Sequence, residues 1–149
     1  MTQFLETTVD KFSFKVATDR LYTPEGLWAR LEDGQVRIGV TDFFQQHNGD
    51  VAFAEVMPVG MALAAGEEIA TVETIKVDIM LPSPVAGTIT AVNEELELAA
   101  ELINQEPYEA GWLALVQPAD WAADKANLMD PDAYFVHMKA EAEQEAKKI

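Results

Sequence analysis

The chain has 149 residues, enough for one domain that buries roughly two thirds of the surface of its unfolded chain. Hydrophobic residues make up 49% and charged residues 24%, which excludes a disordered or fibrous protein, and no apolar run approaches the roughly 18 residues of a membrane span. A net charge of −16, from 26 acidic and 10 basic residues, makes nucleic acids and anionic membranes unexpected partners, because such a surface repels phosphate groups.

Alternating apolar and polar residues predict a series of short strands. These cover residues 12–17, 27–32, 35–40, 50–57, 88–92 and 112–116. Asp33-Gly34, between the second and third of them, predicts a tight β-hairpin. Residues 43–47 predict a helix of little more than one turn, because Thr41-Asp42 offers an N-cap and Gly49 a stop. Residues 94–103 predict a second short helix.

A longer helix is predicted near the C-terminus. Asp130 offers its N-cap, and Pro131 fits the first turn of a helix. Tyr134, Phe135 and Met138 form an apolar stripe, with which the start of this helix should dock onto the rest of the chain. Many strands and few helices together predict a mainly β barrel or sandwich with short helices and a C-terminal helix. Three large aromatic residues are expected in its core, namely Trp28, Phe53 and Trp112.

The chain lacks the side chains with which a protein performs group transfer unaided. It has no cysteine, which excludes disulfides, thiolate metal sites and a cysteine nucleophile. Its two histidines, His47 and His137, lie far apart without the spacing of a metal pair. We therefore expect a non-catalytic protein, with any chemistry supplied by a cofactor. The first twenty residues lack the basic start and apolar core of a secretory signal, so a cytoplasmic location is expected.

Lys76 is the only basic residue between Arg37 and Lys125. It lies within residues 67–81, which contain no glycine, proline or asparagine and alternate apolar with polar side chains after position 74. Because successive side chains of a strand point to opposite faces, Lys76 should project away from the core. The simplest interpretation of Lys76 is an ordinary solvated lysine. Only the sequence around it favours a functional role.

Glu73-Thr74-Ile75-Lys76, followed by Ser83-Pro84-Val85-Ala86-Gly87, resembles the attachment motif of lipoyl domains, in which an acidic residue precedes the modified lysine by three positions. Other segments, in family order over about residues 20–135, resemble the glycine cleavage H-protein-like lipoyl carriers. They include Tyr22-Thr23-Pro24-Glu25, Gly39-Val40-Thr41-Asp42, Val92-Asn93-Glu94-Glu95-Leu96 and Gly111-Trp112-Leu113. The resemblance implies a lipoyl-domain fold, the barrel-sandwich hybrid, with Lys76 at a hairpin tip that the residue pattern alone does not predict.

This resemblance also implies a division of the chain and a set of partners. Residues 1–20 would form an N-terminal extension with a strand, residues 21–118 the lipoyl-carrier domain, and residues 119–149 a C-terminal helical segment. Lipoic acid would be attached to Lys76 by a lipoate ligase or other lipoyl-attachment machinery, with Glu73 and Asp78 as candidate recognition contacts for its basic surface. Dihydrolipoamide dehydrogenase would reoxidise the arm, and the carrier is expected to be a monomer.

Two cargoes remain open. In H proteins of glycine cleavage, which carry an aminomethyl group, the segment after Tyr-Thr normally reads Lys-Glu-His-Glu-Trp, whereas this chain has Pro24-Glu25-Gly26-Leu27-Trp28. The loss of a histidine and a carboxylate should make the cleft less suited to an ammonium group, and it resembles the lipoate-binding proteins of heterodisulfide-reductase-like sulfur-oxidation systems. We therefore favour a carrier of sulfur species that serves a heterodisulfide-reductase-like complex, with the H protein serving glycine cleavage enzymes as the alternative.

Two further interpretations of the lysine fit the sequence less well. A biotinyl domain normally places methionines on both sides of its lysine, and Thr74-Ile75-Lys76-Val77 has none. An unmodified acidic interaction module would not need the lysine and its surrounding motif. Neither therefore replaces the lipoyl carrier as the expected function.

Overall fold

The computed structural model describes residues 2–147. Its strands are β1 (Phe4–Val9), β2 (Phe12–Ala17), β3 (Leu21–Tyr22), β4 (Leu27–Glu32), β5 (Gln35–Val40), β6 (Val51–Val56), β7 (Ala62–Leu63), β8 (Glu68–Thr74), β9 (Asp78–Pro82), β10 (Gly87–Val92) and β11 (Ala114–Pro118). Its helices are α1 (Asp42–Asn48), the 3-10 turn η1 (Glu94–Glu97), α2 (Leu102–Gln105), α3 (Trp121–Lys125) and α4 (Pro131–Lys147). The predicted mainly β class with short helices and a C-terminal helix is confirmed.

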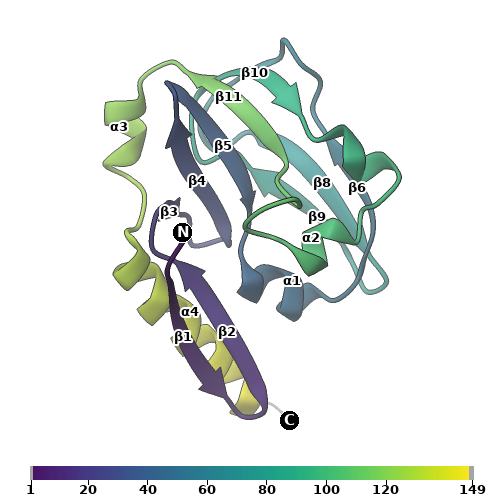
Figure 1. Cartoon of the computed structure of the whole chain (residues 1–149), viewed down its shortest axis with the longest axis vertical. Coiled ribbons are helices and arrows are strands. Elements are labelled where there is room, and N and C mark those ends of the chain that lie inside the picture. The colour runs from purple at the N-terminus through teal and green to yellow at the C-terminus, as the bar shows by residue number, and fades with distance from the viewer. Residues whose placement is uncertain (1, 148–149) are drawn as a thin grey trace.

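Two sheets form the body of the molecule, and a separate hairpin extends from it (Figure 1). The larger sheet has the strand order β3-β4-β5-β11-β10-β7, and the smaller one has the order β6-β8-β9. An aliphatic core lies between them, with Val36, Ile38 and Ile89 from the larger sheet and Val72 and Leu81 from the smaller one. We call this cluster of buried residues the aliphatic core. It holds the β8–β9 hairpin, which carries position 76, against the body.

A second cluster joins both ends of the chain to the larger sheet. The β1–β2 hairpin packs along α4, as Figure 1 shows, and both contact the first helix, α1, or the strands near it. Large side chains from these segments meet in what we call the aromatic cluster: Phe14, Tyr22, Trp28, Phe43, Tyr108, Tyr134 and Met138. The tyrosine rings of Tyr22 and Tyr134 stack at 4.6 Å between centroids. The predicted docking of the C-terminal helix through Tyr134 and Met138 is confirmed, since both side chains are buried.

Local sequence signals located several elements correctly. The hairpin of residues 27–32 and 35–40 forms at the predicted residues, and Asp33 and Gly34 at its turn have the positive φ angles that such a turn requires. Thr41 caps α1, since its hydroxyl oxygen accepts a hydrogen bond from the backbone N–H of Phe44, and Gly49 ends the helix. The strand β1 was not predicted, because its partner β2 and α4 bury only one of its faces partially.

The prediction of one helix over residues 94–103 is wrong. The segment forms the turn η1 and then the separate helix α2. Tertiary hydrogen bonds determine this break: Asn93 donates to the carbonyls of Ala110 and Trp112, while Asn104 accepts from the N–H of Val51. Each half is thus tied to a different part of the body.

Phe53 is not a core residue, contrary to the prediction. Its side chain is 47% exposed on the outer face of β6. The pairing of β6 with β8 shifts between Val51 and Phe53, so the alternation of faces is interrupted there. Val51 and Ala54 point inward instead. Trp28 is fully buried as predicted, and Trp112 is half-buried.

Within residues 2–147 no helix is long and apolar enough to cross a membrane. The division of the chain at residues 20 and 118 stays a prediction. Met1, in its first part, and residues 148–149, in its last part, lie outside the described residues.

Candidate functional site

The β8–β9 hairpin turns tightly around position 76. Thr74 is the last residue of β8 and Asp78 the first of β9, so the turn consists of Ile75, Lys76 and Val77. The nearly buried hydroxyl of Thr74 organises it, accepting hydrogen bonds from the N–H groups of Lys76 and Val77 at 3.2 and 3.1 Å. The N–H of Thr74 donates to the carbonyl of Val77 at 2.9 Å. Threonine hydroxyls are able to replace glycine or asparagine in forming turns, and this signal was missed in the sequence.

Lys76 is exposed at the tip of this hairpin. Its neighbour Ile75 is 80% exposed and Val77 45% exposed, so the tip projects into solvent. Among the described residues, no hydrogen bond or ion pair engages the Lys76 amine. The lysine stem passes over Gly49 at the end of α1, where an added Cβ atom would lie 3.6 Å from Lys76 Cε. The amine is therefore accessible and free to be acylated.

Glu73 and Asp78 flank the lysine from the two strands. They occupy directly opposed positions in the β8–β9 register, and both are exposed. Residues opposed in an antiparallel pair project on the same face of the sheet, so the two carboxylates lie on one face. Phe53 stands next to Glu73 in the same row, on β6. The structure thus brings all three predicted site residues, Glu73, Lys76 and Asp78, together at one end of the smaller sheet.

A cleft of about 350 Å³ lies beside the turn on one side of α1. Gly26 and Val77 line it, together with His47 and the carboxylate-bearing residues Glu25 and Glu141. Gly26 has a φ of +95°, a conformation that side chains other than glycine's rarely adopt. Leu27 is fully buried in the aliphatic core and does not line the cleft.

The expectation of a cleft unsuited to an ammonium group is therefore only half right. The histidine position is indeed empty, because Gly26 has no side chain. Two carboxylates are nevertheless present, and Glu141 is contributed by α4, a segment that sequence reasoning did not connect with the site. Glu141 pairs with His137 one turn earlier, at 2.5 Å. The cleft lining therefore keeps two acidic residues, of which Glu25 makes no ion pair within residues 2–147, and a carboxylate stabilises a cationic group beside it.

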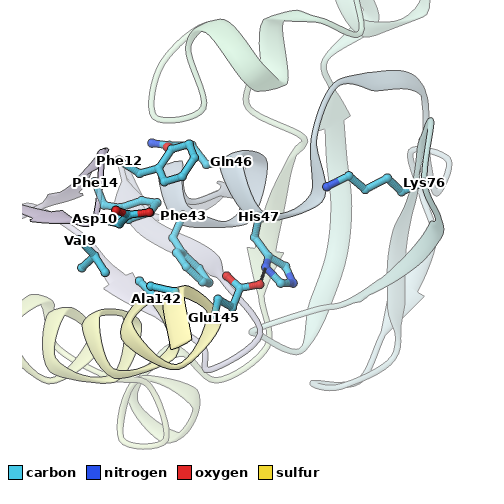
Figure 2. A pocket seen from close by; sticks show the side chains of 11 residues that line it. Val9, Asp10, Phe12, Phe14, Phe43, Gln46, His47, Lys76, Ala142 and Glu145 are labelled. Atoms are coloured by element: carbon cyan, nitrogen blue, oxygen red, sulfur yellow. Dashed lines mark ion pairs between the residues drawn. The ribbon is translucent and has the colours of Figure 1, made fainter. Parts of the chain in front are cut away.

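A second cavity, of about 370 Å³, opens on the other side of α1 (Figure 2). Lys76 itself lines it, together with Phe12 and Phe14 of the N-terminal hairpin, Phe43 of α1 and Ala142 of α4. An ion pair between His47 and Glu145 links α1 to α4 at its edge. Sequence reasoning assigned no function to His47 and none to the N-terminal extension.

The sequence model of the family described as "Glycine cleavage H-protein" matches residues 20–141. The chain belongs to this family. A glycine cleavage system H protein from Bacillus velezensis is 41% identical over 116 residues, covering 78% of this chain and 91% of that protein. The corresponding protein from Mycobacterium avium is 45% identical over 123 residues, covering 80% and 93%.

Two further comparisons bear on the H-protein fold and on its extent in this chain. The crystal structure of a glycine cleavage system H protein from Mycobacterium marinum is similar with a TM-score of 0.70 and 32% identity, covering 78% of this chain and 94% of that one. The expected lipoyl-domain type of fold is thereby confirmed. The glycine cleavage system H protein 4 of Aquifex aeolicus is 33% identical over 135 residues and covers 91% of this chain. This match covers a larger share of this chain than those to the two H proteins named above.

Proposed function

We propose that this protein is a non-catalytic carrier, lipoylated on Lys76, that acts as the H protein of a glycine cleavage system. One observation carries the proposal: in a member of the H-protein family, the exposed amine of Lys76 stands at the tip of a hairpin without a partner among residues 2–147. The relatives named glycine cleavage system H protein support an aminomethyl cargo. They reverse the preference for a sulfur cargo that the sequence alone suggested.

The residues at the hairpin tip fit an amide-linked lipoyl group. The amine needs no partner to be displaced, and the turn is held by Thr74 through bonds that do not involve the lysine side chain. Acylation would therefore leave the hairpin unchanged. A lipoyl group supplies a disulfide that opens to two thiols, one of which can hold a carried group. Lys76 contributes the attachment point, and the stiff hairpin fixes where the arm begins.

Glu73 and Asp78 are proposed as recognition contacts for the lipoyl-attachment machinery. They present two exposed carboxylates on one face beside the lysine. A ligase surface with basic side chains would orient the hairpin through them, because complementary charge steers association and fixes register. The net charge of −16 would act in the same direction at longer range, and added salt would weaken it.

The cleft beside Val77 supports the aminomethyl cargo. Glu25 and Glu141 place two carboxylates on its lining, and a loaded aminomethyl group is an ammonium at neutral pH. A sulfur species carries no such charge and would gain nothing from them. The sulfur-oxidation alternative, with a heterodisulfide-reductase-like complex as partner, retains one supporting observation, which is the missing side chain at Gly26.

Partners follow from this proposal. They are a lipoate ligase or other attachment machinery, the glycine cleavage enzymes that load and unload the arm, and dihydrolipoamide dehydrogenase, which reoxidises it. Tethering the cargo to Lys76 raises its local concentration at each of these sites. A cytoplasmic location remains the expectation from sequence.

Intact-mass analysis tests the attachment site. After incubation with a lipoate ligase, ATP and lipoate, the wild-type chain should gain the mass of one lipoyl group, and Lys76→Arg should gain none. Lys125→Arg is the control, because Lys125 is also exposed but lies outside the motif. Circular dichroism should show unchanged melting of Lys76→Arg, since an exposed side chain contributes little to stability. Acylation of Lys76→Arg, or none of the wild type, would refute the assignment.

Reconstitution tests the cargo. Lipoylated wild-type protein, mixed with glycine decarboxylase, aminomethyltransferase and dihydrolipoamide dehydrogenase, should support glycine turnover, and Lys76→Arg should support none. A lipoylated protein without glycine turnover would refute the glycine cleavage assignment while leaving lipoylation of Lys76 intact. The sulfur alternative would then replace it.

A further inference from the structure

The second cavity is built largely from segments outside the part of the chain that the family model matches. Its volume is about 370 Å³, and the family match covers residues 20–141. Outside that match, the lining includes Val9, Asp10, Phe12 and Phe14 of the β1–β2 hairpin and Ala142, Glu145 and Ala146 of α4. Phe14, Phe43 and Ala142 are buried at 6%, 7% and 5% exposure and form an apolar floor. The rings of Phe14 and Phe43 meet edge to face at 5.4 Å.

Exposed and charged residues form the rim of this cavity. Phe12 is 47% exposed, so part of its ring is available to a group that enters the cavity. His47 stacks on Phe43 at 5.5 Å and forms the ion pair with Glu145 that Figure 2 shows. This pair connects α1 with α4 and so holds two walls of the cavity together.

Lys76 faces the cavity from the opposite hairpin. Figure 2 shows its side chain extended, with the nitrogen directed toward α1, the helix that carries Gln46 and His47. The stem passes over Gly49, where the absence of a side chain leaves its path open. An acyl chain joined to this nitrogen would continue in the direction of the aromatic floor.

The chemistry of the arm matches this lining. Acylation replaces the lysine ammonium by a neutral amide followed by a hydrocarbon chain and a dithiolane ring. Burial of apolar surface favours such a group in an apolar pocket. Sulfur atoms also make favourable contacts with the edges of aromatic rings, three of which are present here as Phe12, Phe14 and Phe43.

We propose that the unloaded lipoyl ring on Lys76 rests in this cavity, against Phe12, Phe14 and Phe43, and that the N-terminal hairpin thereby shelters its disulfide from bulk reductants. The proposal rests on lipoylation of Lys76, the first part of the proposed function. The resting site adjoins the cleft lined by Gly26 and Val77 and shares Phe43 and His47 with it, but only the resting site is lined by Phe12 and Phe14 of the N-terminal hairpin. The proposal gives the N-terminal hairpin a role of its own, which is to cover the resting lipoyl ring.

The rate at which a water-soluble phosphine reduces the dithiolane tests the shelter. Fully lipoylated protein, verified by intact mass, is followed through the loss of dithiolane absorbance, with free lipoamide as the unsheltered reference. The wild-type protein should react more slowly than lipoamide. Phe12→Ser should accelerate the reaction about threefold or more, because the measured rate scales with the undocked fraction of the arm. Phe12 is half exposed, so this variant should keep its fold.

Two matched variants control this experiment. Leu31→Ser changes an equally exposed residue, at 47%, that does not line the cavity, and its rate should equal the wild-type rate. Val77→Ser changes the other cleft and should also leave the rate unchanged. Reduction of the wild type as fast as lipoamide, or acceleration by Val77→Ser in place of Phe12→Ser, would overturn the shelter while lipoylation stands. Absence of the lipoyl mass would overturn both proposals.

Discussion

The aliphatic core and the aromatic cluster support the two sides of the site by different means. The aliphatic core lies between the sheets, and its side chains carry no titratable group. It positions the Lys76 hairpin through residues such as Val72 and Leu81. The aromatic cluster joins both chain ends to α1, and two of its members, Phe14 and Phe43, form the floor of the second cavity.

Hydrogen bonds set the aromatic cluster apart. The hydroxyl of Tyr108 donates to the carbonyl of Lys15 at 2.8 Å, and the indole N–H of Trp28 donates to the carbonyl of Pro107 at 3.0 Å. The guanidinium of Arg20 lies over the Trp28 ring at 4.5 Å. Such bonds are directional, so they fix orientation as well as distance. The cluster therefore gains geometric precision and acquires a sensitivity to pH that the aliphatic core lacks.

Alkaline pH should break the aromatic cluster selectively, with the largest effect of the changes considered. All three tyrosines of the chain, Tyr22, Tyr108 and Tyr134, belong to it, and burial raises the pKa of each above its ordinary value of about 10. The unfolded chain therefore releases these protons at lower pH than the folded one, so stability is full below pH 10 and falls above it. Three phenols correspond to about 4 kcal/mol per pH unit.

Urea unfolding at several pH values between about 8 and about 11.5 measures how the free energy of unfolding changes with pH. Tyrosine fluorescence and near-ultraviolet circular dichroism report on the aromatic cluster, while far-ultraviolet circular dichroism reports on the sheets. A free energy of unfolding that stays constant above pH 10 would contradict the conclusion that the three phenols are buried with raised pKa values.

Truncation within each cluster should open different parts of the molecule. Met138 and Leu81 are both almost completely buried, and replacement of either by alanine should cost about 2–5 kcal/mol. We expect Met138→Ala to lower hydrogen-exchange protection mainly in α4 and β1–β2. Leu81→Ala should lower it mainly in β8 and β9, because these strands depend on the aliphatic core.

Val136→Ala is the control for this pair of variants, since Val136 lies on the same helix as Met138 and is 68% exposed. It should change stability by less than about 0.5 kcal/mol. Equal loss of protection in all strands after either truncation would show that the two clusters unfold as one unit, and the contrast between them would then be geometric only.

The two clusters also differ in how far the sequence predicts them. The hairpin around Asp33-Gly34 and the Thr41 cap depend on a few neighbouring residues, so their signals are local and the predictions were right. Alternation located most strands of the sandwich for the same reason. It failed at Phe53, where an irregularity in the β6–β8 pairing changes which face each residue occupies.

The burial of Trp28, Tyr134 and Met138 was predicted, but the assembly of the aromatic cluster was not. Its members come from both ends of the chain, from β4 and α1 and from the loop at Tyr108, and only the folded topology brings them together. The turn at Lys76 was inferred from family resemblance, because the Thr74 hydroxyl that forms it gives a weak sequence signal. The second cavity lies between that turn and the aromatic cluster, so residue pattern alone did not predict it.

Removal of a single hydroxyl provides the smallest and most specific test. Tyr134 shares a hydrogen bond of 2.9 Å with the buried hydroxyl of Thr41, which also accepts from the N–H of Phe44 at 3.1 Å. Tyr134→Phe leaves the helix cap intact and should cost about 0.5–1.5 kcal/mol at neutral pH. Above pH 10 the variant has one phenol fewer to keep protonated, so its stability falls by about 1.4 kcal/mol per pH unit less than that of the wild type.

The stability curves of Tyr134→Phe and the wild type should therefore cross about one pH unit above 10. At that pH the smaller alkaline destabilisation of the variant equals the free energy lost with its hydrogen bond. Urea unfolding of both proteins at matched pH locates the crossing. Tyr108→Phe serves as the parallel variant, because its hydroxyl bonds to the Lys15 carbonyl on β2 and its pKa is also raised by burial. Parallel curves without a crossing would mean that Tyr134 reaches water before the cluster unfolds, and that α4 detaches from the body as a separate step.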